Sequence, residues 1–376
     1  MTKKQILRCI AFLLIVLIML RMLCVLFDQS HGENAESSFH TYRELTEDTV
    51  DAVFIGTSGV ACYWIAPLAY EEYGMTVYPL ASDAMPSWLY INVMEEALTY
   101  QDPDLFILDI RPFTADAKDA EYMDAWARVV LESMEFFSVN RVRTAFKIME
   151  TIHSVHNNVP RWDVSYLLNY VKYHSMWSDD TFRFSEQMNS DVRRHPYGGF
   201  MLNYDFTGNV EEQKPHRYDD TVYEQLLPLH ETALYEILEY AREKNLNLLF
   251  VDTPKVITSD TTMGRINRVY QILEEEGFPC VTYLSAEEDS GFSIDLDCKS
   301  DFFNADHVNY YGAEKFTRAF ASSLDERYDL PDRRQETAVQ MDWDGWYGNI
   351  LEFMEDLEEY LANGGQTSSE NIPIGE

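Results

Sequence analysis

Five short runs of apolar residues, separated by longer helical patterns, constrain the fold of this chain more than any other feature. They are "VDAVFIG" (50–56), "MTVYPLA" (75–81), "DLFILDI" (104–110), "NLNLLFVDTP" (245–254) and "PCVTYL" (279–284). Each run is nearly continuous in apolar residues, as are strands of a parallel sheet that is covered on both faces. The pattern therefore predicts an α/β fold, a three-layer α/β/α sandwich around a mainly parallel sheet.

Helical patterns fill the gaps between these runs, at 58–74, 86–101, 221–245 and 263–277. Gly74 is a typical stop signal, and Pro86 suits a first helical position. Residues from about 114 to 219 interrupt the alternation with an aromatic-rich stretch that holds three tryptophans. We interpret this stretch as a helical insertion beside the sheet, where selectivity for substrate or partner would reside.

The N-terminus, "MTKKQILRCIAFLLIVLIMLRMLCVLF", places three basic residues ahead of a long apolar run. As a helix, 6–27 would span about 33 Å, enough to cross a bilayer. The basic flank predicts a cytoplasmic N-terminus and a main domain outside the cell membrane. Arg21 interrupts the run, near enough to its outer end to snorkel. The alternative is a cleaved signal peptide, but only a weak cleavage motif follows.

The remaining boundaries follow from composition. Residues 1–28 are predicted to be the cytoplasmic flank and anchor, 29–49 a polar tether, and 50–329 the folded domain. The acidic tail, 330–376, has apolar residues spaced along one helical face up to Gly364: Trp346, Ile350, Phe353, Leu357 and Leu361. We expect this helix to pack on its own domain; the alternative is that it binds a partner.

Charge and cysteine content limit the possible functions. The chain has 64 acidic and 29 basic residues, a formal net charge of −35, which would repel nucleic acid. Cys9 and Cys24 lie in the predicted anchor, and the exported part holds Cys62, Cys280 and Cys298. Cys280 and Cys298 are the local candidates for a disulfide, with reduced thiols as the equal alternative.

Two residues suggest chemistry at the carboxyl edge of the predicted sheet. Ser58 follows the first strand, where a serine either caps the next helix or acts as a nucleophile. His307, in "FFNADHVNYYGAEKF", follows the last strand and precedes a helix, and histidine is the side chain that titrates near neutral pH. Each residue alone has an ordinary explanation, as a helix cap or a surface histidine.

Together the motifs resemble the SGNH or GDSL hydrolase superfamily from Asp51 to about Asp329. The blocks that carry the resemblance are "DAVFIGTSGV", "YPLASDAMPSWLY", "DLFILDIRP" and "DFFNADHVNYYGAEKFT", with "LNLLFVDTPK" as a later strand. The chain looks like the membrane-anchored branch related to D-alanyl-lipoteichoic-acid biosynthesis and alginate-acetylation proteins. The resemblance implies a flavodoxin-like sheet, Ser58 as nucleophile, His307 as general base, and no cofactor.

The sequence also departs from this family. The aspartate expected three residues before the histidine is Asn304, and Asp301 is the upstream carboxylate that a folded-back loop would bring close. The oxyanion-donor glycine of the second block is Ala81, and the asparagine of the third block is absent, which leaves Arg111 as a source of positive charge. Gly59 after the serine allows a close approach of substrate.

Two functions from different classes follow. The first is an extracytoplasmic serine esterase or O-acyltransferase acting on an acylated cell-surface glycopolymer. The second is a catalytically weakened domain that binds a glycan or lipid-linked polymer and supports a membrane-bound O-acyltransferase. A metal site at His153 and His156 is the weaker alternative, because no acidic partner is evident and exposed helix histidines explain the spacing.

Overall fold

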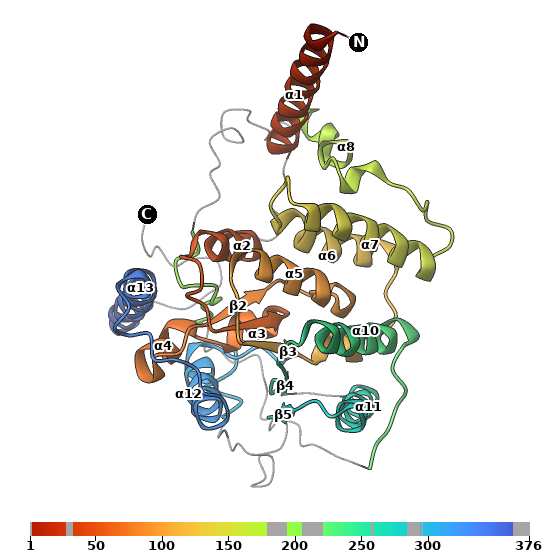
Figure 1. Ribbon diagram of the computed structural model, residues 1–376. Coiled ribbons are helices and arrows are strands. Elements are labelled where there is room, and N and C mark those ends of the chain that lie inside the picture. Colours follow the sequence, from red (N-terminus) through yellow and green to blue (C-terminus); the bar gives the residue numbers. More distant parts are fainter. Residues whose placement is uncertain are drawn as a thin grey trace.

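The computed structural model describes residues 2–27, 33–178, 194–204, 221–256, 259–283, 294 and 296–363. Within these residues the centre of the protein is a five-stranded sheet in the order β2-β1-β3-β4-β5, with every neighbouring pair parallel (Figure 1). The strands are β1 (Ala52–Gly56), β2 (Val77–Ala81), β3 (Leu105–Asp109), β4 (Leu248–Asp252) and β5 (Cys280–Thr282). All five runs predicted as strands are confirmed.

Helices connect the strands, and in Figure 1 α4 and α12 lie to one side of the column of strands while α10 and α11 lie to the other. The helices are α1 (Lys3–Leu26), α2 (Glu33–Glu44), α3 (Ser58–Tyr63), α4 (Ala66–Tyr73), α5 (Tyr90–Tyr100), α6 (Ala120–Ser133), α7 (Val139–Val155), α8 (Tyr170–Tyr173), α10 (Pro228–Lys244), α11 (Asp260–Glu276), α12 (Tyr310–Arg327) and α13 (Thr337–Ala362). The pattern at 58–74 thus forms two helices rather than one.

Aromatic side chains pack together in the core where β1, α3 and α12 meet. Every residue of β1 is buried, and Phe54 packs edge-on against Trp64 and Phe320, with ring centroids 6.3 and 5.7 Å away. Burial of aromatic side chains of this size contributes roughly 1.5–3 kcal/mol each to folding. This packing brings the first turn after β1 close to the helix that follows the histidine loop.

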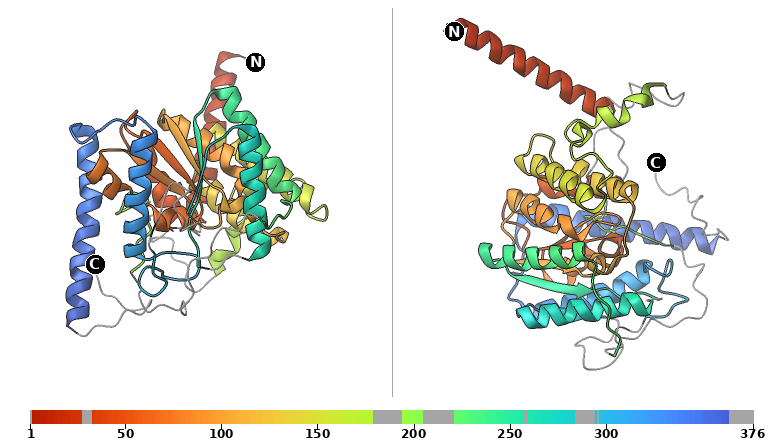
Figure 2. Two further views of the ribbon diagram at one scale, coloured as in Figure 1. Left: turned by 90° about the horizontal axis from the view of Figure 1, so that it is seen from below. Right: turned by 90° about the vertical axis from the view of Figure 1, so that its right-hand side faces the viewer.

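The N-terminal helix α1 is the one helix among the described residues that is long and apolar enough, over Lys3–Cys24, to cross a membrane. It projects from the rest of the protein (Figure 2). The expected polar tether is wrong for residues 33–44, which form α2, whereas residues 28–32 lie outside the described part. The segment is polar overall, but the spacing of Ala35, Phe39 and Tyr42 places them on one face of the helix, and all three are buried.

The insertion and the tail both pack on the domain. α6 contacts α2 and α7, and α7 contacts α5; residues 179–193 and 205–220, most of which fall in the predicted insertion, lie outside the described part. Trp346, Ile350 and Leu357 of α13 are buried, as expected for a helix docked on its own domain. Its predicted end at Gly364 is not among the described residues. The five cysteines, including Cys280 and Cys298, are free thiols.

Candidate active site

Ser58 is the first residue of α3 and directly follows the strand–helix turn at the carboxyl edge of the sheet. Thr57, not Ser58, caps this helix: its Oγ1 accepts a hydrogen bond from the backbone N–H of Gly59 at 3.3 Å. The same hydroxyl donates to Oδ2 of Asp109, the buried last residue of β3, at 3.1 Å. Because Thr57 has the capping role, the hydroxyl of Ser58 is available to another partner.

Hydrogen bonds from α3 to distant segments hold the histidine loop in place. The hydroxyl of Tyr63 donates to the carbonyl of Pro254, in the loop after β4, and lies 3.4 Å from the carbonyl of Asp306. Thr317 of α12 donates to the carbonyl of Tyr63 at 3.1 Å and accepts from the backbone N–H of Ile65 at 2.9 Å. These contacts connect the segments that carry the candidate nucleophile and the candidate base.

Gly312 allows α12 to approach the histidine loop closely. A Cβ at this position would lie 2.2 Å from the carbonyl oxygen of Asp301 and 2.7 Å from Cβ of Val308. Asn309 caps the helix through its Oδ1, which accepts from the backbone N–H groups of Tyr311 and Gly312 at 3.1 and 3.2 Å. The glycine in "NYYGAEKF" is therefore required by packing against the loop that presents His307.

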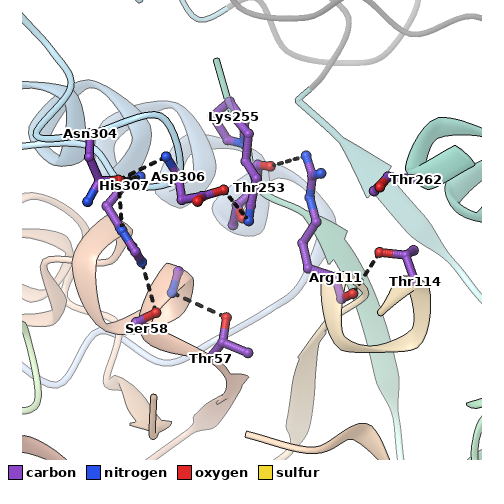
Figure 3. Close-up of polar contacts among 12 residues, drawn as sticks. Thr57, Ser58, Arg111, Thr114, Thr253, Lys255, Thr262, Asn304, Asp306 and His307 are labelled. Carbon is purple, nitrogen blue, oxygen red and sulfur yellow. Dashed lines mark hydrogen bonds and ion pairs between the residues drawn. The ribbon is translucent and has the colours of Figure 1, made fainter. Parts of the chain in front are cut away.

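The structure brings Ser58 and His307 together. Oγ of Ser58 lies 2.8 Å from Nε2 of His307, and Nδ1 of His307 lies 3.0 Å from Oδ1 of Asn304 (Figure 3). The same Oδ1 accepts from the backbone N–H groups of Asp306 and His307 at 2.9 and 3.0 Å, which identifies this atom as the amide oxygen. Nδ1 must therefore carry the ring proton, and the lone pair of Nε2 faces the serine hydroxyl.

Burial and charge keep His307 in its neutral form. Burial lowers the pKa of His307 from its ordinary value, and the nearby Lys255 ammonium lowers it further, while Asp306 and Asp83 act in the opposite direction. Lys255 is 2.9 Å from Oδ1 of Asp306, so the two charges largely offset each other beside the ring. A neutral imidazole with an accessible lone pair is the form needed to accept a proton near neutral pH.

Asp301 and Asp306, the two aspartates closest to His307 in the sequence, do not contact its ring. Asp301 is buried, with Oδ2 2.7 Å from Nζ of Lys315 and 2.6 Å from the backbone nitrogen of Asp297. The expectation that Asp301 could replace the missing triad aspartate is therefore wrong, because a fixed ion pair and backbone hydrogen bonds direct it away. Asp306 points to Lys255 (Figure 3). Among the described residues, the amide of Asn304 is the hydrogen-bond partner of Nδ1.

Not all of the residues expected to bind the oxyanion or the substrate line the cavity. Arg111 and Gly59 line the same cavity as Ser58, whereas Ala81 is buried at the end of β2 and does not line it. Arg111 is itself mostly buried, with Nε 2.6 Å from Oδ1 of Asp252 and an Nη2 that donates to the carbonyl of Thr253 at 2.9 Å. Burial raises the pKa of Asp252 to about 6, with Arg111 opposing the rise. The guanidinium thus lies at the cavity wall as one partner of a buried ion pair with Asp252.

Ala84, in the block "YPLASDAMPSWLY", is a cavity residue that the sequence did not indicate. It has a φ of 46°, a left-handed conformation that is uncommon for a residue with a Cβ, and it lines the cavity beside Met85 and Pro86. Its neighbours in the sequence contain no glycine or asparagine that would mark such a turn. Lys255 was also not predicted as a site residue, although it directly follows a predicted strand end and could have been predicted from that position.

The dyad opens into a cavity of about 1160 Å³ that reaches from the carboxyl edge of the sheet to the insertion. Its apolar wall includes Trp88, Tyr122, Met123 and Trp126, and α7 and α10 add polar side chains. Among these is His230, whose Nδ1 lies 3.0 Å from Oγ of the buried Ser87 and whose pKa burial lowers to about 4. The volume is large enough for a substrate of several rings or a chain with a headgroup.

The described residues contain no cluster of three or more side chains suited to holding a metal ion. Nδ1 of His153 lies 2.8 Å from the carbonyl of Val159, and Nε2 of His156 lies 2.8 Å from that of Lys118. Each imidazole thus has a backbone partner, which accounts for both side chains without a metal.

Comparisons with known proteins add no relative: no protein-family model matches the chain, and no curated protein sequence matches it. The function is therefore inferred from the geometry of the site. That geometry comprises a hydroxyl within proton-transfer distance of a neutral imidazole, an amide that fixes the ring tautomer, and a guanidinium on the wall of the same cavity. This arrangement is suited to nucleophilic attack by a serine on an electrophilic carbon.

Proposed function

We propose that this chain is an extracytoplasmic, membrane-anchored serine esterase or O-acyltransferase that acts on an acylated cell-surface glycopolymer. The observation that carries the proposal is the 2.8 Å separation of Ser58 Oγ from His307 Nε2. The tautomer fixed by Asn304 makes this contact a donor hydroxyl facing an acceptor nitrogen, the arrangement in which a general base activates a serine.

In the proposed reaction Ser58 Oγ attacks the carbonyl carbon of an ester while His307 Nε2 takes the hydroxyl proton. The C–O bond to the leaving alcohol then breaks, His307 returns the proton to that oxygen, and the acyl group remains on Ser58. Water, or a hydroxyl of the acceptor polymer, attacks the acyl-enzyme and passes its proton through His307 back to Ser58. Arg111 supplies positive charge toward the oxyanion from the cavity wall.

The parallel sheet and its strand order support assignment to the SGNH type, a three-layer sandwich with a flavodoxin-like sheet. In such open sheets, active sites form outside the carboxyl ends of the strands. Ser58 and Arg111 follow β1 and β3, and Lys255 follows β4, so the proposed site occupies that edge. Selectivity for the polymer would come from the insertion, since α6 and α7 line the cavity.

The membrane part of the proposal depends on α1. Its apolar length supports a single-pass anchor, and Lys3, Lys4 and Arg8 support a cytoplasmic N-terminus with the domain outside. A membrane-bound O-acyltransferase that delivers the acyl group is the partner that this location would suit.

A second candidate function is favoured by one observation, the uncharged Asn304 on Nδ1 of His307. An amide orients the ring but does not offset the charge of an imidazolium. The protein would then bind a glycan or lipid-linked polymer and support the acyltransferase with little turnover of its own.

The test is Ser58→Ala, with Ser37→Ala on α2 as the matched control. We expect a fluorophosphonate probe to label the unmodified protein and the control but not Ser58→Ala. Hydrolysis of p-nitrophenyl acetate should fall by roughly 10³-fold or more, as when an acyl-enzyme nucleophile is removed. Equal labelling of all three proteins would refute the nucleophile, and surface acylation that survives Ser58→Ala would favour the binding function.

A further inference from the structure

Helix α7 exposes apolar side chains on one face. Val139, Val142 and Phe146 have exposed fractions of 68%, 42% and 41%, and their spacing of three and four residues places them in one row along the helix. The opposite side of the helix packs on α5 and α6 through buried residues such as Ala145 and Ile148. α7 is therefore apolar toward the core and also along a row that faces solvent.

Two exposed aromatic residues outside the helix extend the apolar row. Phe137, in the loop before α7, is 64% exposed, and Trp162 is 69% exposed and meets the ring of Phe146 edge-on at 5.8 Å. We call these five residues, Phe137, Val139, Val142, Phe146 and Trp162, the α7 face. A contiguous exposed patch of aromatic and branched side chains on a soluble surface marks a contact site.

The α7 face begins beside the outer end of α1. The guanidinium of Arg21 lies 4.6 Å from the ring centroid of Phe136, the neighbour of Phe137, and α1 also contacts α8, with Cys24 buried there. Arg21 is five residues before Leu26, about 7.5 Å along the helix, and its long side chain reaches Phe136 near this end of α1. If α1 crosses a bilayer, this loop lies at the depth of the lipid headgroups and upper acyl chains, where aromatic residues concentrate.

We propose that the α7 face lies in the outer-leaflet interface of the bilayer that α1 crosses. The inference depends on the membrane anchor in the proposed function and does not depend on the acyl chemistry. Of the basic residues of α7, Arg143 has a largely exposed side chain (66%), whereas Arg141 is buried and Lys147 is paired with Glu236. Helices that lie on membranes combine an apolar row with exposed basic side chains of this kind.

The position of α7 has a consequence for the substrate. Its neighbouring face contributes Lys147, Thr151 and Ser154 to the cavity wall. The cavity is then separated from lipid by one helix, about 10 Å in diameter. An acceptor polymer or acyl donor held at the membrane surface would reach Ser58 without the domain leaving that surface.

The test uses the full chain in nanodiscs that contain a phospholipid with a diazirine near its headgroup. After illumination, mass spectrometry locates the lipid adducts. We expect adducts on α1 and on peptides that cover 136–146. The internal control is α13, which lies away from α7 (Figure 1) and whose Met341 and Leu351 are exposed by 79% and 46%. In the variant Phe137→Asp with Phe146→Asp, adducts on 136–146 should be lost, whereas Met341→Asp should leave them unchanged.

Two results would overturn the inference. If α1 is labelled and 136–146 is labelled no more than 341–351, the α7 face is not in lipid, although the anchor stands. If α1 is not labelled, the anchor fails and the inference fails with it. Esterase activity of the same sample, measured separately, shows whether the proposed chemistry survives either result.

Discussion

Replacing Asn304 with aspartate tests whether the missing charge limits the proposed reaction. Oδ1 of Asn304 already contacts Nδ1 of His307 at 3.0 Å and accepts two backbone N–H bonds, so an aspartate can take the same position and be held ionised. In triad serine proteases the reverse change costs about 10⁴-fold in kcat, because the tautomer is wrong. Here the tautomer is fixed, so only the charge is lacking.

The size of the gain follows from the geometry. Charge centres about 5 Å apart, at an effective dielectric constant near 20, interact by about 3 kcal/mol. Because Asn304 is only half-buried, about 2 kcal/mol is a fairer figure, which corresponds to roughly 30-fold in kcat. The carboxylate stabilises the imidazolium that forms as Ser58 loses its proton, so it lowers the barrier and also raises the pKa of His307.

The assay is kcat for p-nitrophenyl acetate hydrolysis across pH. Asn304→Asp should be faster on the alkaline plateau, and its acidic limb should move to higher pH, because the base form of His307 is lost earlier as pH falls. Asn304→Leu, which keeps the volume but removes the acceptor, should be slower than the unmodified protein. A plateau that does not rise, together with an acidic limb that does move, would refute the argument that charge limits this site.

Two further predictions concern residues around the dyad. Lys255→Met should move the acidic limb of kcat/KM to higher pH, because Lys255 lowers the pKa of His307 and also pairs with Asp306, which raises that pKa. An acidic limb that stays in place or moves to lower pH would contradict these assigned effects on His307. Gly312→Ala should lower stability by about 1–3 kcal/mol and reduce turnover, since the added Cβ would lie 2.2 Å from the carbonyl of Asp301. Gly348→Ala on α13, where a Cβ would meet no atom within 4 Å, should instead raise the melting temperature slightly in the same thermal denaturation series.

The sheet was predictable from the sequence because its strands are buried on both faces. In each of β1 to β4 every residue is buried, which requires the continuous apolar runs that mark them. α2 was missed for the opposite reason: its buried residues, such as Phe39 and Tyr42, are outnumbered by polar ones over 33–44, so composition concealed a periodic apolar face.

The site was predictable in part. Ser58 and His307 were singled out because the carboxyl ends of parallel strands meet at one edge of a sheet, and because the motifs around them resemble the SGNH hydrolases. Asp301 was wrongly considered because sequence distance does not reveal its pairing with Lys315. Ala84 was missed because a left-handed alanine leaves no mark in the residue type, and the role of Thr57 as the cap became evident only from its contact with Asp109.

Because α2 packs on the domain, it also limits how far the domain can lie from α1. If α1 is the membrane anchor of the proposed function, residues 28–32 join it to α2, and a stretch of this length extends to no more than about 18 Å. Under the proposed function, so short a connection would keep the domain near the membrane surface. The domain would then meet its polymer close to the lipid, during assembly or export.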